Sequence, residues 1–397
     1  MSRASSSSKP CIVDVINLSS SADTLLRERV LSLRAKGVDN RIVCIDGPYV
    51  RPLREAGIPV DTYHLPRGFD PFRLTWALLE LVAYFRRVKP DLVHTHCSVP
   101  GIVGRIAARL AGVPVVLHTV HGFAFHDGSR GPGAAATMAV ERFAGRLTDV
   151  LLSQNHEDVE RARRHRIVPE GRIEWVGNGI ALERFLGAAP DLRSGATHRE
   201  SGQPVVITCV ARMEPIKNHA LLIEAASRLK ASGRPFELWL VGGGEGRARC
   251  ERQVAEAGLA HEVRFLGYRD DIPELLGRSD IGVLTSLKEG IPRAAVEAMA
   301  AGLPMVATRV TGTREVVRDG DTGFLVDVDD AAGCAEALAR LADDPALRAR
   351  MGARGREVAR EEFDEALIVR RLERVYRASL ERRGIGVPAA LATEVRA

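Results

Sequence analysis

The sequence predicts two doubly wound α/β domains, each a parallel β-sheet covered by helices. Three observations support this fold class. Strand and helix signals alternate along most of the chain, the alternation breaks once between residues 187 and 203, and 397 residues exceed what one ordinary core holds. A hydrophobic fraction of 45% is sufficient for two large cores.

The first half of the chain reads as one such domain, over residues 11–186, after a flexible terminus at residues 1–10. Runs rich in β-branched residues predict strands, and amphipathic segments between them predict helices. The expected strands are residues 12–16, 41–45, 91–96, 113–122 and 149–155. The expected helices are residues 24–35, 73–90, 101–112 and 157–167.

Residues 187–203 are rich in Gly, Ala, Ser and charge, so they are predicted to be a linker. The alternation restarts in a second domain over residues 204–362. Its expected strands are residues 204–213, 236–244, 262–268, 280–286, 305–308 and 322–327. Its expected helices include residues 218–233, 246–258 and 272–279, and a strongly helical tail covers residues 336–383.

Composition limits the classes of function. A net charge of +5 is compatible with phosphate ligands or anionic lipid, but it is too mild to indicate nucleic acid, which is not expected as a partner. The six cysteines have no metal-binding or redox spacing, and the terminus has no apolar signal region. These features predict a cytoplasmic protein with reduced thiols.

The segment over residues 285–317 contains the most informative motif. Glu289 precedes a short apolar helix that contains Glu297, and a carboxylate on such a helix is costly unless a partner satisfies it. The helix start offers backbone N–H groups at Gly290, Ile291 and Arg293, which can hold a phosphate. A sugar nucleotide carries hydroxyl groups at both ends and phosphates between them. Two carboxylates on either side of an anion site match that layout. The structural alternative is an ordinary surface ion pair between Arg293 and Glu297.

Two further segments of the second domain support a donor site. Arg212 and Lys217 follow its first strand and suit a diphosphate, although they are also compatible with an exposed charged loop. Gly242 and Gly244 belong to a glycine-rich turn that lets the backbone approach a ligand or pack closely. The turn lacks the spacing of a dinucleotide fingerprint.

Histidines gather at the ends of two expected strands of the first domain. His94, His96, His118, His121 and His126 suggest zinc, but no carboxylate stands at ligand spacing beside them, so no metal is expected. Histidines that alternate with apolar residues at a strand end are expected to face a ligand. His121 is the candidate for chemistry, against a merely structural role.

These motifs, together with "HTVHGFAFH", "VGNGI" and residues 263–304, resemble the retaining family-four glycosyltransferases of the GT-B fold, from about Cys11 to about Leu380. The segment "VHGFAFH" is similar to enzymes that build cell-surface polysaccharides and glycolipids. The resemblance implies two facing Rossmann-like domains, with residues 363–397 returning to the first. It also implies transfer of a hexose or N-acetylhexosamine from a nucleotide, commonly UDP with GDP as the alternative, to a hydroxyl acceptor that is a lipid-linked saccharide or a small molecule. The transfer would need no metal, no cofactor and no protein nucleophile.

The resemblance implies roles by position. Arg212 and Lys217 would hold the diphosphate, Glu289 the donor sugar and Glu297 the ribose. The remaining donor contacts would come from Gly290, Ile291 and Pro292 at the phosphates and from Arg264, Leu266 and Gly267 near the base. The acceptor side would include Ser19, Ser20, His96, His121 and Phe123. One departure is the segment at residues 17–25, where serines replace the glycines of many relatives.

Two other functions remain open. A nonhydrolysing sugar-nucleotide epimerase would need several acid/base carboxylates, and no persuasive set is found. A catalytically silent scaffold is disfavoured by Glu289, Glu297, Arg212 and Lys217. Basic residues of the first domain predict peripheral contact with an anionic membrane, at the inner face, and an ordinary solvated surface is the alternative. They are Arg86, Arg87, Lys89, Arg161, Arg163, Arg164, His165 and Arg166.

Overall fold

The computed structural model describes residues 9–64, 70–123, 125, 131–186 and 203–392. Residue contacts divide the chain into two compact units, one of residues 1–176 with 369–397 and the other of residues 177–368. The predicted linker lies outside the described residues except for Gln203, and so do His126 and residues 1–8 of the predicted flexible terminus.

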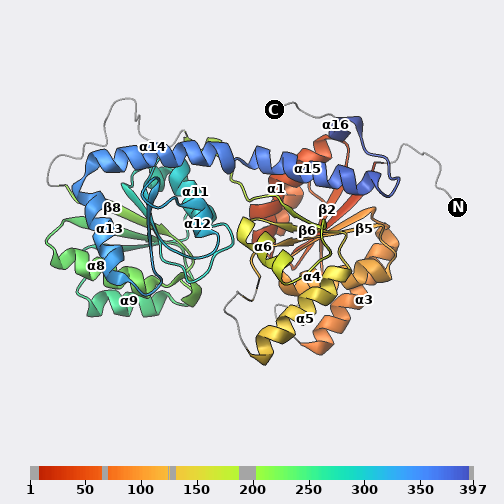
Figure 1. Cartoon of the computed structure of the whole chain (residues 1–397), viewed down its shortest axis with the longest axis horizontal. Helices are drawn as coiled ribbons and strands as arrows, with labels where there is room; N and C mark the ends of the chain where they lie inside the picture. Colours follow the sequence, from red (N-terminus) through yellow and green to blue (C-terminus); the bar gives the residue numbers. More distant parts are fainter. Residues whose placement is uncertain (1–8, 65–69, 124, 126–130, 187–202, 393–397) are drawn as a thin grey trace. The chain divides into compact units, whose positions relative to one another are not determined.

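Unit 1 contains a parallel sheet of seven strands in the order β3-β2-β1-β4-β5-β6-β7 (Figure 1). The strands are β1 (Cys11–Val15), β2 (Asp39–Cys44), β3 (Val60–Thr62), β4 (Leu92–His96), β5 (Val115–Val120), β6 (Val150–Ser153) and β7 (Ile173–Trp175). The helices are α1 (Ser19–Ala35), α2 (Val50–Glu55), α3 (Pro71–Val88), α4 (Ser98–Leu110), α5 (Pro132–Arg146), α6 (His156–Arg164), most of α15 (Glu365–Glu381) and α16 (Ala389–Ala392). The strand order reverses between β1 and β4, which creates a switch point where ligands bind in such sheets.

Alternate strand residues build two cores on the two faces of this sheet. On one face, Ile12 and Leu92 pack with Leu372, Tyr376 and Leu380 of α15. On the other face, alternate residues of the same strands pack with α3 and α4. Val13 of β1 and Val93 of β4 lie there with Leu81, Tyr84 and Phe85 of α3. The predicted return of the C-terminal helix to the first domain is therefore confirmed.

Unit 2 contains a parallel sheet of six strands in the order β10-β9-β8-β11-β12-β13. The strands are β8 (Val205–Val210), β9 (Phe236–Val241), β10 (Val263–Gly267), β11 (Ile281–Leu284), β12 (Met305–Thr308) and β13 (Gly323–Val326). The helices are α7 (Glu183–Leu186), the 3₁₀ turn η2 (Pro215–Lys217), α8 (His219–Ala231), α9 (Arg247–Glu256), α10 (Ile272–Gly277), α11 (Arg293–Ala300), α12 (Thr313–Val316), α13 (Ala331–Asp343) and α14 (Pro345–Glu362). The switch point here falls between β8 and β11, and the predicted fold class of two Rossmann-like domains is confirmed.

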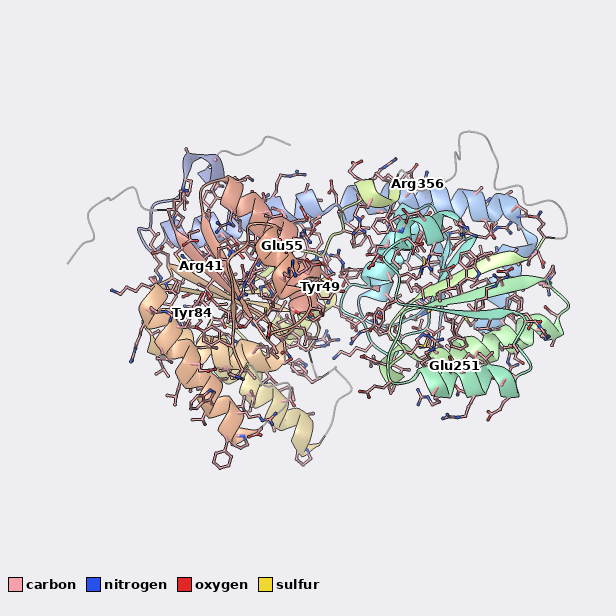
Figure 2. All side chains as sticks on the ribbon, turned by 180° about the vertical axis from the view of Figure 1, so that it is seen from behind. Arg41, Tyr49, Glu55, Tyr84, Glu251 and Arg356 are labelled. Carbon is pink, nitrogen blue, oxygen red and sulfur yellow. The ribbon has the colours of Figure 1, made fainter. Side chains whose placement is uncertain are left out.

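Long-range contacts hold the helices of each unit in place. In unit 2, Figure 2 labels Arg356 on α14. Its guanidinium donates a hydrogen bond of 3.0 Å to the carbonyl of Ala301, just after α11. In unit 1, the Tyr84 hydroxyl of α3 lies 2.7 Å from a carboxylate oxygen of Asp61 in β3. Within the described ranges, no helix combines the length and apolar character needed to cross a membrane.

The sequence prediction differs from the structure in a few elements. Helix α1 begins at Ser19 rather than at residue 24, so the serine segment forms its first turn instead of a loop. The sequence patterns did not predict α2, α5, β3 or β7. The strands β3 and β7 have three residues each, which is too short to show an alternating pattern.

Candidate active site

Two neighbouring strands of unit 2 bring Lys217 and Glu289 together. Lys217 lies in η2 after β8, and Glu289 lies after β11, between that strand and α11. The Lys217 Nζ is 2.6 Å from Glu289 Oε1, and the two side chains are 19% and 11% exposed. The hydroxyl of Thr285 also donates to the carbonyl of Asn218 at 3.0 Å, which ties the two loops together. The ion pair lies at the carboxyl end of the sheet, where ligands bind in this architecture.

Glu297 lies inside α11 with a partly buried side chain. Burial raises the pKa of its carboxyl group, while the charges of Arg293 and Arg184 act in the opposite direction. Arg293 donates instead to the backbone carbonyl of Gly179 at 2.6 Å, so the predicted alternative of an Arg293–Glu297 surface pair is wrong. Among the described residues, the Glu297 carboxylate makes no hydrogen bond or ion pair, so it can accept hydrogen bonds from a ligand's hydroxyl groups.

The turn before α11 is fixed by a close backbone approach. Gly312 has φ +76°, and a Cβ atom there would lie 1.4 Å from the carbonyl oxygen of Gly290. Ile291 is buried and Pro292 directly precedes α11. This packing leaves room only for glycine at position 312. It also fixes the start of α11, where the first N–H groups have no intrahelical acceptor.

The glycine-rich turn after β9 packs against the segment that carries Arg212. A Cβ at Gly242 would lie 2.2 Å from the carbonyl oxygen of Ala211, and one at Gly244 would lie 2.8 Å from that of Met213. The two glycines thus allow close backbone packing. The Arg212 side chain is 58% exposed, and its guanidinium is 2.6 Å from Glu214. An exposed guanidinium in such a fixed segment can reach an anionic ligand.

The residues predicted near the base occupy different parts of β10. Gly267 lies at the carboxyl end and its carbonyl accepts a 2.8 Å hydrogen bond from the N–H of Gly242, so it joins the glycine-rich turn. Leu266 is half-buried beside it. Arg264 lies earlier in the strand, with its guanidinium 3.0 Å from Glu237.

In unit 1, the predicted acceptor-side residues lie after β1, β4 and β5. Ser19 and Ser20 form the first turn of α1. His96 ends β4 and His121 directly follows β5, with 3.3 Å between His96 Nδ1 and His121 Nε2. Burial and the neighbouring His96 lower the pKa of His121 to about 3, so its ring is neutral at physiological pH. Phe123 is buried and its ring packs against Phe125 at 5.0 Å.

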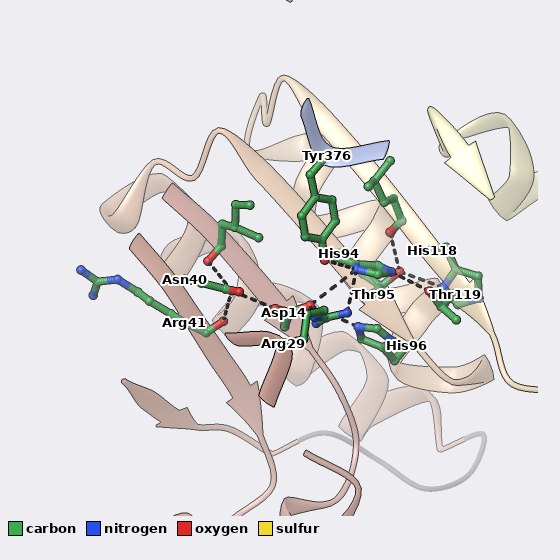
Figure 3. A network of polar contacts seen from close by, with 12 residues as sticks. Asp14, Arg29, Asn40, Arg41, His94, Thr95, His96, His118, Thr119 and Tyr376 are labelled. Carbon is green, nitrogen blue, oxygen red and sulfur yellow. Dashed lines mark hydrogen bonds and ion pairs between the residues drawn. The ribbon is translucent and has the colours of Figure 1, made fainter. Parts of the chain in front are cut away.

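Sequence reasoning missed a buried polar network that adjoins these histidines (Figure 3). Asp14 of β1 contacts Arg29 of α1, Asn40 of β2 and His96, while His94 contacts Tyr376 of α15. The sequence signal that could have revealed it is an aspartate in the apolar run at residues 11–16. Asp14, His94 and His96 place ligand atoms within 4.8 Å of one another. However, the Arg29 guanidinium already occupies Asp14, so the set fits a hydrogen-bond network better than a cation site.

Two Rossmann-like domains, of which the second carries a Lys–Glu pair at its switch point and, in α11, a carboxylate without a partner among the described residues, define the GT-B class of nucleotide-sugar enzymes. Comparison with known families agrees. The model "Glycosyl transferases group 1" matches residues 195–358, and "Glycosyl transferase 4-like domain" matches residues 23–179.

Curated relatives and solved structures give the same result. The chain is 35% identical over 278 residues to the Escherichia coli "UDP-Gal:alpha-D-GlcNAc-diphosphoundecaprenol alpha-1,3-galactosyltransferase", covering 68% of this chain and 71% of that protein. It is 30% identical to the D-inositol 3-phosphate glycosyltransferase of Corynebacterium glutamicum (strain R), covering 75% and 74%. The Anabaena Alr3699/HepE structure with UDP and glucose superposes with a TM-score of 0.76 at 19% identity, covering 92% and 99%. The chain belongs to the family-four glycosyltransferases of the GT-B fold, which use nucleotide-sugar donors.

Proposed function

We propose that this glycosyltransferase is a retaining enzyme that moves a hexose or N-acetylhexosamine from a UDP sugar to a hydroxyl group of a lipid-linked saccharide. The observation that carries the proposal is the Lys217–Glu289 ion pair before α11, followed within that helix by Glu297, a carboxylate with no partner among the described residues. The E. coli relative is named for transfer from UDP-Gal to a diphosphoundecaprenol-linked sugar, and the Anabaena structure holds UDP and glucose. Both names support a UDP sugar as donor, and the first supports a lipid-linked acceptor.

The donor site supplies charge where the reaction needs it. Lys217 and Arg212 bind the diphosphate with the N–H groups at the start of α11, and they stabilise the negative charge that develops on the leaving group. Because two side-chain cations serve this role, we propose that no metal and no cofactor is required. Glu297 accepts hydrogen bonds from the ribose, and Glu289 holds hydroxyl groups of the donor sugar.

The chemical step follows from these contacts. The acceptor oxygen attacks the anomeric carbon from the face that the diphosphate leaves, so the anomeric configuration is kept. The bond between the anomeric carbon and the β-phosphate oxygen breaks, and the leaving phosphate takes the acceptor's proton. The neutral ring of His121 serves as a hydrogen-bond partner for a hydroxyl group of the acceptor or transferred sugar.

The test is a transfer assay on the full chain. UDP-galactose, UDP-glucose, UDP-GlcNAc and GDP-mannose are each offered with a polyprenyl-diphosphate-linked GlcNAc, with an acceptor-free control and a chelator arm. The proposal expects UDP release that requires the acceptor and survives the chelator, and a product whose anomeric configuration, read by NMR, matches the donor. Donor interconversion without acceptor would instead support an epimerase. Donor binding without turnover would support a scaffold.

We also propose that unit 1 contacts an anionic membrane, where a lipid-linked acceptor would lie. Along the outward side of α3, Phe72, Trp76 and Leu79 are 88%, 60% and 61% exposed, at the i, i+4, i+7 spacing of one helix face. Val140 and Phe143 of α5 are also exposed, and α4 lies between the two helices (Figure 1). Exposed basic residues accompany them on the same helices or, for Lys89, directly after α3: Arg73, Arg86, Arg87, Lys89, Arg142 and Arg146. Aromatic and aliphatic side chains flanked by basic ones are typical of membrane-surface helices.

The structure changes which basic residues can take part. Arg161 of α6, predicted from the sequence as a membrane contact, is buried and paired with Asp158 and Glu157, so that part of the prediction is wrong. Arg163 of the same helix pairs with Glu160 at 2.6 Å. The membrane proposal therefore rests on α3 and α5 rather than on α6.

A further inference from the structure

The buried network of unit 1 connects Asp14 to His121 through one intermediate ring. Asp14 and Asn40 are fully buried, and His96 is 2% exposed. His96 Nε2 lies 3.2 Å from Asp14 Oδ1, and His96 Nδ1 lies 3.3 Å from His121 Nε2. Asp14, His96 and His121 thus form a continuous chain from the interior of the sheet to the residue that follows β5.

The sheet register explains why these side chains meet. In the parallel pairing of β1 with β4, Asp14 is opposite His94, and His96 follows two residues later on the same face. His118 of β5 points to the opposite face, where a Cβ at Gly101 of α4 would lie 2.4 Å from its ring. Strand alternation therefore separates His118 from the chain that leads to His121.

The residues around Asp14 keep it ionised. Burial alone would raise its pKa, but the Arg29 guanidinium and the hydrogen bond from His96 outweigh burial, so the pKa of Asp14 is lowered. Asn40 donates a further hydrogen bond of 2.8 Å to the other carboxylate oxygen. An ionised carboxylate only accepts hydrogen bonds, so the proton of the His96 ring must lie on Nε2.

The position of the proton on the His96 ring determines the position of the proton on the His121 ring. Burial lowers the pKa of His96 and keeps its ring neutral, so Nδ1 carries a lone pair. The facing Nε2 of His121 must then donate its proton, which leaves the lone pair of the neutral His121 ring on Nδ1. This nitrogen can accept a hydrogen bond from a ligand hydroxyl. A hydrogen bond with the side chain of Gln154 raises the pKa of His121, but burial outweighs it.

We propose that Asp14 is a positioning residue, which acts through His96 to fix the ring tautomer of His121 so that Nδ1 accepts hydrogen bonds. The role of His121 in sugar transfer rests on the proposed transferase function. The tautomer of its ring does not depend on that function. The backbone directly after the intermediate residue is constrained. Cys97, directly after His96, has φ +63°, a strained conformation that the surrounding packing must maintain. His94 is held separately by Thr119 at 2.7 Å and by Tyr376 at 2.6 Å.

The test begins with a readout that needs no substrate. NMR of the full chain with 15N-labelled histidine distinguishes a ring protonated on Nε2 from one protonated on Nδ1. The proposal expects His121 in a single Nε2–H tautomer in the wild type. In Asp14→Asn the amide can present either its oxygen or its NH2 group to His96, so both tautomers of His121 appear. In His96→Phe, which cannot hydrogen-bond to His121, the single tautomer is also lost.

Tyr376→Phe is the matched control, because it removes a buried hydrogen bond of the same network that lies outside the Asp14–His96–His121 chain. It should leave the His121 tautomer unchanged. Asp14→Asn should lower kcat for transfer by about ten- to a hundredfold, with KM for the donor nearly unchanged, as expected when a group that orients a histidine is lost.

Three outcomes overturn the proposal: His121 protonated on Nδ1 in the wild type, a single Nε2–H tautomer that persists in both Asp14→Asn and His96→Phe, or loss of the tautomer in Tyr376→Phe as well. If no sugar transfer is found but the tautomers behave as expected, the proposed function fails while the link from Asp14 to His121 stands. Folding of each variant is checked by thermal unfolding.

Discussion

The ammonium nitrogen of Lys217 lies 2.6 Å from a carboxylate oxygen of Glu289, although the two residues are 72 positions apart. The strands that precede them, β8 and β11, are neighbours at the switch point of unit 2. The pair fixes the position of the lysine before any ligand binds. A charge held in place in this way stabilises an anionic leaving group without reorganisation at the moment of reaction.

Lys217→Ala should therefore lower kcat/KM for transfer by about two to three orders of magnitude, the cost of removing one fixed donor from developing negative charge. Steady-state kinetics of UDP release measures the effect. The control is Lys230→Ala, which removes an exposed lysine of the same unit that pairs with Glu262 at 2.8 Å. An unchanged kcat/KM in Lys217→Ala would contradict the role assigned to the pair.

The sequence predicted the central strands of both sheets because their long β-branched runs are buried on both faces. It predicted Lys217, Glu289 and Glu297 because these charges stand next to apolar elements. It could not show that Lys217 and Glu289 touch, because that contact depends on the pairing of β8 and β11. Tyr376 was missed for a similar reason, since it lies 282 residues from the ring of His94 that it contacts. Helix α1 starts earlier than predicted because serine is weakly disfavoured in helices, and packing overrides that preference.

Glu297→Gln should separate binding from stability. Because burial raises the pKa of Glu297 above its usual 4.5, the folded protein binds a proton that the unfolded chain releases. The free energy of unfolding thus falls as pH rises from about 4.5 through the folded pKa. The amide does not ionise, so the variant should be more stable than the wild type near neutral pH and should lose the UDP-induced rise in Tm. Thermal unfolding with and without UDP tests both effects, and a variant that keeps the UDP shift would exclude Glu297 from the donor site.

Two glycines of unit 2 offer a matched test of backbone packing. Gly312 and Gly320 have nearly the same φ, +76° and +77°, but only a Cβ at Gly312 would strike another backbone, at Gly290; at Gly320 nothing lies within 4 Å. Gly320→Ala should cost about 1–2 kcal/mol of stability, the strain of a left-handed alanine. Gly312→Ala should cost more, because the turn at the start of α11 has to move, and it should weaken UDP binding. Urea unfolding and UDP titration measure the two effects, and equal costs at the two positions would contradict the packing argument.

The buried histidines of unit 1 should make the protein sensitive to acid. Burial is the first cause that lowers the pKa of His94, His96, His118 and His121 below 6.5. Below about pH 6.5 the unfolded chain takes up protons that the folded unit does not, so the free energy of unfolding should fall by up to about 1.4 kcal/mol per ring for each pH unit. Urea unfolding at several pH values from about 7 to about 5 measures the slope. The variant His64→Asn, which replaces an exposed histidine, is the control and should show the same slope as the wild type. A free energy of unfolding that does not vary with pH over this range would refute the expectation.

The membrane surface of unit 1 can be tested by separating its charges from its apolar side chains. Arg86→Gln with Arg87→Gln removes two exposed charges from the end of α3, at about 1 kcal/mol each near an anionic surface, so partition should weaken by about thirtyfold. Phe72→Ser with Trp76→Ser removes apolar contact instead, so the remaining binding should be almost wholly sensitive to salt. Pelleting with vesicles of zwitterionic lipid, with and without an anionic lipid, gives the partition.

Val328→Ser supplies the control for these variants, because it changes an exposed apolar side chain that belongs to unit 2. It should pellet like the wild type. Both double variants should bind less than the wild type, and added salt tells them apart. Salt should weaken the remaining electrostatic binding of the Phe72→Ser, Trp76→Ser variant more than the remaining apolar binding of the Arg86→Gln, Arg87→Gln variant. If anionic lipid does not increase the pelleting of the wild-type protein, the membrane proposal is refuted. The exposed face of α3 would then bind another partner, and sugar transfer would not take place at a membrane surface.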